Sequence, residues 1–542
     1  MTFANPSRCR AAPAAALVLT ALSAALPAAG LAQDVTYELQ RGDTLIGIGE
    51  RMLERPSDWM RLRRINRIDD PYRMSTGARL RIPVALLRRE SVPATVSQVV
   101  GTASAYSRPV AGGERIEPRT ELATGDDGYL TIELADGTHL TLQPRSRLHL
   151  DALQRRAAAG ITDSRLRLEQ GRIEALVPKL GGRGSVQQLR TPGALISIRG
   201  THYRAQAEDG GLARVEVTEG TVAVGSGRQP ERAVGAGFGL VAVAGSALSL
   251  PRPLLAAPDL GGVALLQERV TMQLRFAALA AARAYRVQLA ADPAFQAILG
   301  EKVVDVPEAR IGGLPDGDYH LRVRGIDAQG LEGMDAVRQI ALRARPEPPF
   351  PSAPADGAKV RGDAATLRWA AMVEADSYLL QLAADAGFEP ILLQQTGLRA
   401  TELTPPGRLE PGEYFWRVAS VRADGQRGPF GDAQRFVLHA SPAAPDAPML
   451  EGDRIAFSWP AEPGQRFEFQ LAGDETFAAP IETRSLTEPR TALERPAAGT
   501  YYMRVRAIDP DGFVGPYTAT QRVEVPARPW WLLLFLLLPL VL

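Results

Sequence analysis

A repeated pattern constrains the fold of the second half of this 542-residue chain more than any other feature. Residues 285–290, 378–383 and 467–472 read Tyr-Arg-Val-Gln-Leu-Ala, Tyr-Leu-Leu-Gln-Leu-Ala and Phe-Glu-Phe-Gln-Leu-Ala. An acid and an aromatic residue follow each segment: Asp292 and Phe295, Asp385 and Phe388, Asp474 and Phe477. Each copy later carries Gly-x-Tyr-x-x-Arg-Val, beginning at Gly317, Gly412 and Gly499. The repeat spans roughly ninety residues, the size of a seven-strand sandwich, so three β-sandwiches are predicted.

Aromatic residues in matching places support three similar cores. Trp369 and Trp459 precede the second and third copies, and Phe276 holds the comparable place in the first. The tyrosine of the Gly-x-Tyr pattern is similar to a tyrosine corner. The three copies resemble fibronectin type III domains, which are expected at residues 260–345, 350–440 and 445–526. Proline-rich joints between them would be semi-rigid spacers, so the resemblance implies distance and docking surface rather than chemistry.

A small unit near the start of the chain has turn residues at both ends. Alternating apolar residues predict a strand over 35–39, and a turn at 41–44 leads into an apolar helical stripe over 45–52. A second helix is expected over 57–66 and a second strand over 78–83. Glycines at 47 and 49 weaken the first helix, each by up to about 1 kcal/mol. The predicted order is strand, helix, helix, strand.

Three motifs of this unit resemble the signatures of the LysM family. They are Tyr37-x-x-x-x-Gly42-Asp43-Thr44-Leu45, Asn66-x-Ile68 and Gly77-x-x-Leu80-x-Ile82-Pro83. The resemblance covers residues 33–90 and implies binding of N-acetylglucosamine-containing glycans, mainly peptidoglycan. It places the sugar in a groove between two loops, formed by Gly42, Asp43, Thr44, Leu45, Asn66, Arg67, Ile68 and Asp69.

Two further considerations bear on this groove. The polar residues Asp43, Thr44 and Asn66 can equally be turn and cap residues that hold the fold together. Residues 37–90 contain twelve arginines and eight acids, an excess that would favour the carboxylates of peptidoglycan stem peptides.

The middle of the chain, residues 91–250, is predicted to be all-β. Residues 130–134 and 139–142 alternate in polarity around Ala-Asp-Gly, which is typical of a hairpin. A second hairpin is expected from Arg165-Leu166-Arg167-Leu168 through a turn at Glu169-Gln170-Gly171 into Ile173, Ala175 and Val177. Almost no helical period occurs in this part of the chain.

This region is similar to the FecR domain. The matching pieces include Leu134-Ala135-Asp136-Gly137, Thr191-Pro192-Gly193, Arg199-Gly200-Thr201-x-Tyr203 and Val217-x-Glu219-Gly220. The resemblance implies a periplasmic domain that receives a signal from an outer-membrane receptor and passes it to a sigma-factor regulator. Within the third piece, Gly200 is expected to permit a tight bend, and Thr201 to pair its hydroxyl locally.

Both ends of the chain are apolar. Residues 1–32 have a positive start, an apolar run and small residues before Gln33, which predicts a cleaved signal peptide and export. A membrane anchor is the alternative. The tail at 527–542 includes Trp530–Leu542, which has no polar side chain and reaches about 20 Å, less than the roughly 30 Å bilayer core. Partial insertion into a membrane and burial against the protein remain open for this tail.

Composition excludes several classes of chemistry. The single cysteine, Cys9, rules out internal disulfides, zinc ribbons and thiol catalysis in the mature chain. With 62 basic and 61 acidic residues, the formal net charge is +1, so no nucleic-acid partner is expected. The five histidines have no metal-ligand spacing, and no nucleophile elbow, phosphate loop or dinucleotide fingerprint occurs. We expect no cofactor, no metal and no enzymatic activity.

The sequence therefore predicts a mainly β, multidomain, exported protein of the periplasm or cell envelope. Its LysM-like unit would bind peptidoglycan, and its FecR-like domain would act as a sensing or interaction platform. An envelope protein would be bound through the FecR-like or fibronectin-like domains, and the tail would contact a membrane. The alternative is a transmembrane signal transducer that regulates a sigma-factor system.

Overall fold

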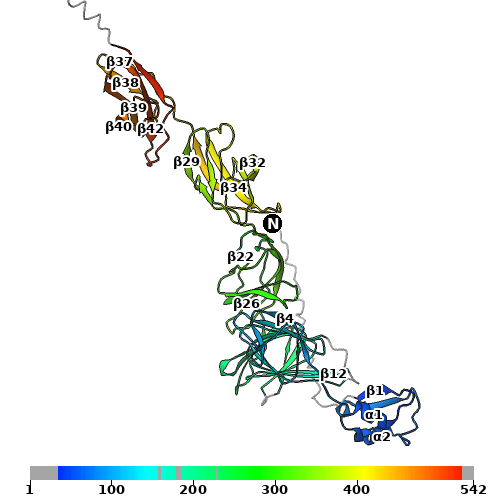
Figure 1. The fold of residues 1–542 in the computed structure, drawn as a ribbon. Helices are drawn as coiled ribbons and strands as arrows, with labels where there is room; N and C mark the ends of the chain where they lie inside the picture. The colour runs from blue at the N-terminus through cyan, green and yellow to red at the C-terminus, as the bar shows by residue number, and fades with distance from the viewer. Residues whose placement is uncertain (1–33, 157–159, 179–184, 227–229, 528–542) are drawn as a thin grey trace, which may run out of the picture. The chain divides into compact units, whose positions relative to one another are not determined.

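The computed structural model describes residues 34–156, 160–178, 185–226 and 230–527 (Figure 1). The chain is mainly β, as predicted, and helices occur near its N-terminus. It divides into two compact units: the first extends to Leu254 and includes Gln329–Leu331, and the second holds Leu255–Ala328 and the residues from Glu332 onward. The predicted signal peptide and most of the predicted hydrophobic tail lie outside the described residues.

No helix among the described residues is both long enough and apolar enough to span a bilayer.

The N-terminal module, residues 34–87, has the predicted order of elements. These are β1 (Asp34–Glu38), α1 (Leu45–Met52), the 3-10 turn η1 (Pro56–Asp58), α2 (Trp59–Asn66), β2 (Arg79–Pro83) and the 3-10 turn η2 (Val84–Leu86). Strand β1 pairs antiparallel with β2, with Tyr37 opposite Leu80. The helices cover this two-stranded sheet through a core that includes the fully buried Leu45, Ile48 and Leu62.

Gly49 has a packing role in α1 that explains its presence in a helix. A Cβ atom there would lie 2.7 Å from the carbonyl oxygen of Pro56 and 3.1 Å from Cβ of Trp59. Real side chains do not approach backbone this closely, so any larger residue would push η1 and α2 away from α1. The cost of a helical glycine is thus offset by close packing of the two helices.

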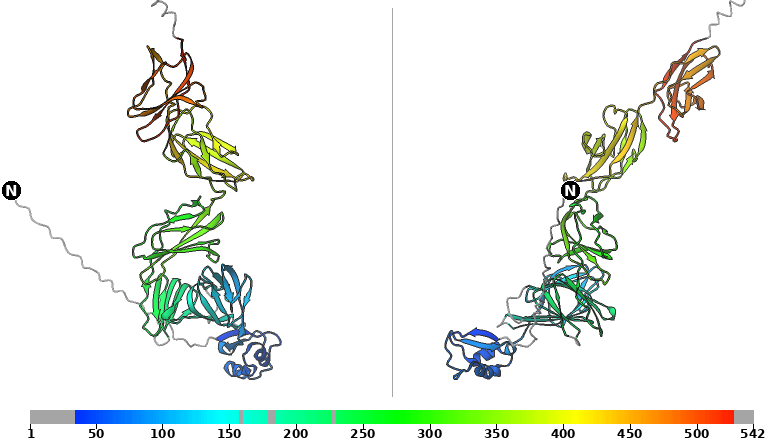
Figure 2. Two further views of the ribbon diagram at one scale, coloured as in Figure 1. Left: turned by 60° about the vertical axis from the view of Figure 1, so that its left-hand side comes forward. Right: turned by 180° about the vertical axis from the view of Figure 1, so that it is seen from behind.

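The middle domain, residues 90–253, consists of strands in two sheets, seen from further sides in Figure 2. The first nine strands are β3 (Glu90–Ser91), β4 (Ala94–Val100), β5 (Ala103–Ala105), β6 (Arg108–Pro109), β7 (Arg115–Ile116), β8 (Glu121–Thr124), β9 (Tyr129–Glu133), β10 (His139–Leu142) and β11 (Arg147–Arg156). The others are β12 (Ile161–Leu176), β13 (Val186–Arg190), β14 (Leu195–Ile198), β15 (His202–Glu208), β16 (Leu212–Glu219), β17 (Thr221–Gly225), β18 (Arg232–Gly235), β19 (Phe238–Val243) and β20 (Arg252–Pro253). Buried leucine, isoleucine, valine and alanine side chains from both sheets form one core.

One predicted hairpin is observed and the other is wrong. Strands β9 and β10 pair antiparallel around Ala135-Asp136-Gly137, as expected. The expected turn at residues 169–171 is instead the middle of β12, a single strand of 16 residues. Its first part pairs with β11 and β13 in one sheet, and its last part pairs with β10 and β15 in the other.

Gly171 marks the point where β12 passes between the sheets. Its φ is +91°, and a Cβ atom would lie 2.4 Å from Cα of Ser146. The glycine therefore allows both a bend and a close backbone approach, without reversing the chain. A local pattern of Glu-Gln-Gly between two alternating segments does not distinguish these two outcomes.

The second compact unit contains three β-sandwiches, each with two sheets. The first consists of β22 (Met272–Arg275) and β25 (Glu308–Ile311) facing β21 (Leu266–Gln267), β27 (Ala336–Leu342), β26 (Gly317–Ile326), β23 (Ala284–Ala290) and β24 (Ile298–Val304). The second consists of β28 (Pro351–Ala353), β30 (Leu367–Trp369) and β33 (Glu402–Leu403) facing β29 (Ala358–Arg361), β36 (Gln434–His439), β34 (Gly412–Val421), β31 (Ser377–Ala383) and β32 (Ile391–Leu398), with β35 (Arg427–Phe430) paired to β34. The third consists of β37 (Met449–Glu451), β38 (Arg454–Ser458) and β41 (Arg490–Glu494) facing β40 (Pro480–Leu486), β39 (Arg466–Ala472), β42 (Gly499–Ile508) and β43 (Gln521–Val525).

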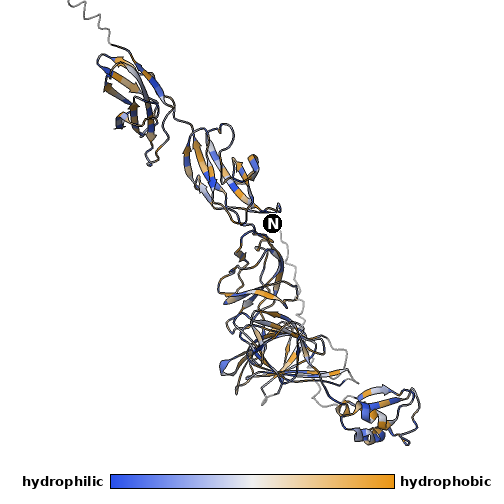
Figure 3. Cartoon of the chain, in the orientation of Figure 1, coloured by the Kyte–Doolittle hydropathy of each residue, from blue (hydrophilic) through white to orange (hydrophobic). Residues whose placement is uncertain are grey.

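The repeated aromatic residues lie where the sequence predicted. Phe276, Trp369 and Trp459 are buried and pack edge-to-face on the first aromatic residue of the repeated segment, at ring distances of 5.0, 5.6 and 5.6 Å. The tyrosine-corner prediction also agrees with the hydrogen bonds, because each tyrosine hydroxyl donates to a carbonyl four residues upstream. The pairs are Tyr319 with Pro315, Tyr414 with Glu410, and Tyr501 with Ala497. The alternation of apolar and polar residues that places these side chains is visible along the strands in Figure 3.

The acid and aromatic residue after each repeated segment form one recurrent loop. In the first sandwich, the Asp292 carboxylate accepts backbone N–H groups from the loop, at 2.7 Å from Ala297. Phe295 takes a φ of +54° and is buried beneath the guanidinium of Arg322, 4.2 Å from the ring centre. The same arrangement occurs in the other two copies, with φ values of +60° at Phe388 and +56° at Phe477.

Candidate functional site

The loop between β1 and α1 is organised by a buried carboxylate. Asp43 Oδ2 accepts hydrogen bonds from the Tyr37 hydroxyl at 2.9 Å and the Gln40 backbone at 2.8 Å. Its Oδ1 accepts one from Arg51 at 2.6 Å, and the Asp43 side chain is only 4% exposed. Asp43 thereby fixes the turn that contains Gly42, whose φ is +91°.

These contacts shift the pKa values of both Asp43 and Tyr37. Burial alone would raise the pKa of Asp43, but hydrogen bonds from Gln40, Arg51 and Tyr37 outweigh it and lower the pKa below its ordinary value. Burial raises the pKa of the Tyr37 hydroxyl, and its hydrogen bond to Asp43 raises it further. Asp43 is therefore a charged, fully engaged group.

The next two residues also serve the fold. Thr44 is the N-cap of α1, and its Oγ1 accepts the Gly47 N–H at 3.0 Å. The Leu45 side chain is buried in the core of the module. Its backbone N–H donates to the Pro71 carbonyl at 3.3 Å, so this contact brings the two predicted groove loops side by side.

The loop between α2 and β2 is held by two side chains. Asn66 donates from Nδ2 to the carbonyls of Leu62 and Arg81, at 2.9 and 2.8 Å, and its Oδ1 accepts the Arg81 N–H at 2.7 Å. Arg63 donates to the carbonyls of Ile68 and Asp69, at 3.0 and 2.7 Å. Asn66 therefore ties the end of α2 to β2, and Arg63 shapes the loop that follows.

Among the predicted groove residues, three present exposed groups. Gly42 has open space where a Cβ would be, and the side chains of Arg67 and Asp69 are exposed. Ile68 is half-buried against the core. The sequence prediction omitted Tyr72, which lies in the same loop and is 69% exposed. An aromatic residue beside Pro71 in a polar loop was the available signal for it.

In the middle domain, the Arg199-Gly200-Thr201 prediction is half confirmed. Gly200 has a φ of +62°, which agrees with the expected bend. Thr201 is buried, and its Oγ1 has no hydrogen-bond partner among the described residues, so the predicted local pairing of its hydroxyl is wrong.

The same domain carries a cluster of a histidine and charged side chains on β8, β11 and β12. His149 Nε2 lies 3.0 Å from Glu169 Oε1 and 3.5 Å from Glu121 Oε2. Arg167 pairs with Asp151 and Glu169, at 3.0 Å from each. Within the described ranges, no group of three or more His, Cys, Asp or Glu residues is arranged to hold a metal ion.

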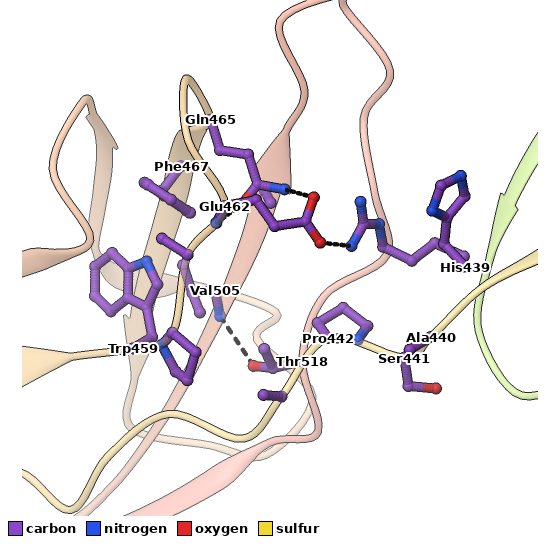
Figure 4. Close-up of a pocket in the computed structure, with 15 residues that line it drawn as sticks. His439, Ala440, Ser441, Pro442, Trp459, Glu462, Gln465, Phe467, Val505 and Thr518 are labelled. Carbon is purple, nitrogen blue, oxygen red and sulfur yellow. Dashed lines mark hydrogen bonds and ion pairs between the residues drawn. The ribbon is translucent and has the colours of Figure 1, made fainter. Parts of the chain in front are cut away.

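A cavity of about 260 Å³ in the second compact unit is lined by residues 439–443 and by the third sandwich (Figure 4). Arg361 Nη1 lies 3.5 Å from Glu462 Oε1, and Gln465 donates to Glu462 at 3.4 Å. Thr518 accepts the Val505 N–H at 3.2 Å. Some polar groups on its wall are thus paired with one another, whereas Arg361 Nε and Trp459 Nε1 have no hydrogen-bond partner among the described residues.

Comparison with known structures gives partial matches. One is a crystal structure of a candidate anti-sigma factor from Parabacteroides distasonis, with 16% identity over 24% of this chain and 59% of that one, at a TM-score of 0.21. The FN1–FN3 domains of chicken CNTN1 match with 18% identity over 50% of this chain and 99% of that one, at a TM-score of 0.22. Fibronectin(III)-like modules of Clostridium thermocellum CbhA match with 13% identity over 33% and 94%, at a TM-score of 0.20. This chain therefore covers somewhat less than two thirds of the length of the anti-sigma-factor structure.

The sequence comparisons are narrower. The chain matches no curated protein sequence. The family model described as FecR protein matches residues 120–223, which include β8 to β16 and most of β17. This part of the middle domain, inside the region where the resemblance was found, is a FecR domain.

Proposed function

We propose that this protein is a non-enzymatic component of the cell envelope that binds peptidoglycan through its N-terminal module. In this proposal the FecR domain serves as a sensing or interaction platform, and the sandwiches are spacers with docking surfaces. The observation that carries the proposal is the pairing of two short loops at one edge of a strand-helix-helix-strand unit with three LysM-like motifs.

The chemistry of these loops suits a sugar with an acetamido group. A shallow site for such a ligand needs exposed backbone amides, one or two polar side chains and an apolar surface. Gly42 leaves its backbone open, Arg67 and Asp69 offer a donor and an acceptor, and Tyr72 offers an aromatic face. Asp43 and Asn66 support this site by fixing the loops, because their polar atoms are engaged inside the module.

The proposal is tested by co-sedimentation of the full chain with purified sacculi. Tyr72→Ala is expected to weaken binding about tenfold, because it removes an exposed ring from the groove without disturbing the core. Met60→Ala is the matched control, since Met60 is 51% exposed on α2, outside both loops. Equal binding by the parent, by Tyr72→Ala and by a chain without residues 33–90 would contradict the proposal.

A second function is favoured by the FecR match: transmission of a signal to a sigma-factor system. It requires a segment of the chain to cross the membrane and a cytoplasmic partner. Mass spectrometry of the mature N-terminus separates the two functions. A chain beginning at Gln33 supports the tethered platform, whereas an intact Met1 supports the transducer.

A further inference from the structure

Four polar atoms at one end of the FecR domain have no hydrogen-bond partner among the residues that the structure describes. They are Tyr203 OH, Thr138 Oγ1, Thr201 Oγ1 and Asp136 Oδ2, and all four are inaccessible to solvent. The whole residues Tyr203 and Thr138 are fully buried, and Thr201 is 2% exposed. Asp136 and Thr201 belong to two of the FecR-like motifs quoted from the sequence.

Strand register brings these residues into one corner. Tyr203 on β15 lies opposite Ala175 on β12, which lies opposite Leu140 on β10. Beyond these strand ends, the Val177 N–H donates to the Thr201 carbonyl at 2.9 Å. The Thr138 N–H donates to Asp136 Oδ1 at 3.0 Å, which folds the β9–β10 turn over the same end.

Electrostatics and packing agree with this placement. Burial raises the pKa of the Tyr203 hydroxyl, and the nearby Asp136 carboxylate raises it further. The turn at Gly220 is closely packed, since a Cβ there would lie 2.6 Å from Thr201 Cγ2. The hydroxyls and the carboxylate at this corner still require partners.

Native proteins satisfy roughly nine in ten or more of their buried polar groups, through protein atoms or ordered water. A buried water typically makes two to four hydrogen bonds to such groups. We propose that this corner binds an ordered internal water molecule, which accepts from Tyr203, donates to Asp136 and bridges to the hydroxyls of Thr138 and Thr201. This water ties the β9–β10 turn to the bend before β15, and it gives the buried threonine and tyrosine hydroxyls a structural role.

Substitutions that remove a hydroxyl but keep the side-chain shape test the proposal in the full chain, because the two alternatives predict opposite changes in the rate of hydrogen exchange. If water is bound, Tyr203→Phe and Thr201→Val each leave it with fewer partners, and hydrogen exchange in peptides covering 130–142 and 199–207 should accelerate about tenfold. If the hydroxyls are unpaired and dry, the same substitutions remove unsatisfied groups, so exchange should be unchanged or slower. The second result overturns the proposal.

A control and a direct observation complete the test. Tyr319→Phe removes a hydroxyl that donates to Pro315 at 2.6 Å, so it should accelerate exchange in the first sandwich and leave the FecR domain unaffected. A high-resolution crystal structure of the full chain should show a water within hydrogen-bond distance of at least three of the four atoms. An empty corner, or a density peak that strengthens when rubidium replaces sodium, contradicts a water site.

Discussion

At the scale of single residues, the polar side chains of the N-terminal module act mainly on the protein itself. Asp43 accepts hydrogen bonds from Tyr37, Gln40 and Arg51, and Asn66 bonds the backbone of both elements that it joins, α2 and β2. The residue types were predicted from the motifs, and the alternative role as turn and cap residues was predicted with them. The tertiary structure adds that both carboxylate oxygens of Asp43 accept hydrogen bonds within the module.

Asp43→Asn should destabilise the N-terminal module by about 1–3 kcal/mol at neutral pH, because it weakens a buried, charge-assisted network. Since folding lowers the pKa of Asp43, its stabilisation is complete above the unfolded pKa of about 4 and is lost as pH falls through the folded value. The difference between variant and parent should therefore shrink in acid. Hydrogen exchange of peptides covering 35–53, corrected for the intrinsic rate at each pH, measures this. A constant difference from pH 7 to pH 3 would contradict the assignment.

The first sandwich contains a network of buried charged side chains centred on Glu332. Glu332 accepts from Arg286 at 2.7 Å and from Arg324 at 2.9 Å, and its side chain is 1% exposed. Glu332→Gln removes the carboxylate that Arg286 and Arg324 share and leaves them with Glu301 and Asp335, so the sandwich should lose about 2–4 kcal/mol of stability. Glu308→Gln, at an exposed pair with Arg275, is the control and should change little. Urea unfolding followed by proteolysis of the first sandwich gives both values, and equal effects would refute the role of burial.

Among the elements of the fold, the loop after β23, β31 and β39 has the same conformation in all three sandwiches, and the repeated acid and aromatic residue lie in it. The acid and the aromatic residue could be found by aligning the copies. Their backbone conformation could not be predicted from such an alignment, because a left-handed backbone at phenylalanine is unfavourable in isolation. It is stabilised when the ring is buried and an arginine from the neighbouring strand stacks on it.

Phe388→Ala should therefore destabilise the second sandwich by about 3–5 kcal/mol, because it removes a buried ring and one of the two rings, Phe388 and Phe430, on which Arg417 stacks. The ring of Phe388 lies 3.9 Å from that guanidinium. Phe350→Ala is the matched control, since Phe350 is 76% exposed. Hydrogen exchange of peptides covering 378–398 compares the two, and an equally small effect of both would show that the loop does not depend on its ring.

At the scale of the whole molecule, the described residues contain five separate hydrophobic cores. One belongs to the N-terminal module, one to the middle domain, and one to each sandwich. Because buried apolar contacts are the main cooperative interaction, each core should unfold as its own unit.

Leu274→Ala should lower the stability of the first sandwich by about 2–5 kcal/mol, since Leu274 is fully buried. Exchange in the second and third sandwiches should remain as in the parent chain. Differential scanning calorimetry with hydrogen exchange of each domain checks this. A shift of every transition together would mean that the cores unfold cooperatively.

The order of the elements, the three-fold repeat and the aromatic cores could be predicted from the amino-acid sequence, because these follow from local periodicity, turn residues and side-chain size. Only the packing of the folded chain determines which polar motif residues form hydrogen bonds within the fold, where β12 crosses from one sheet to the other, and which hydroxyls are buried. Those outcomes depend on contacts between segments far apart in the chain, such as Asn66 with Arg81 and Val177 with Thr201. No local pattern carries that information, since pairing across a sheet is set by the packing of the whole domain.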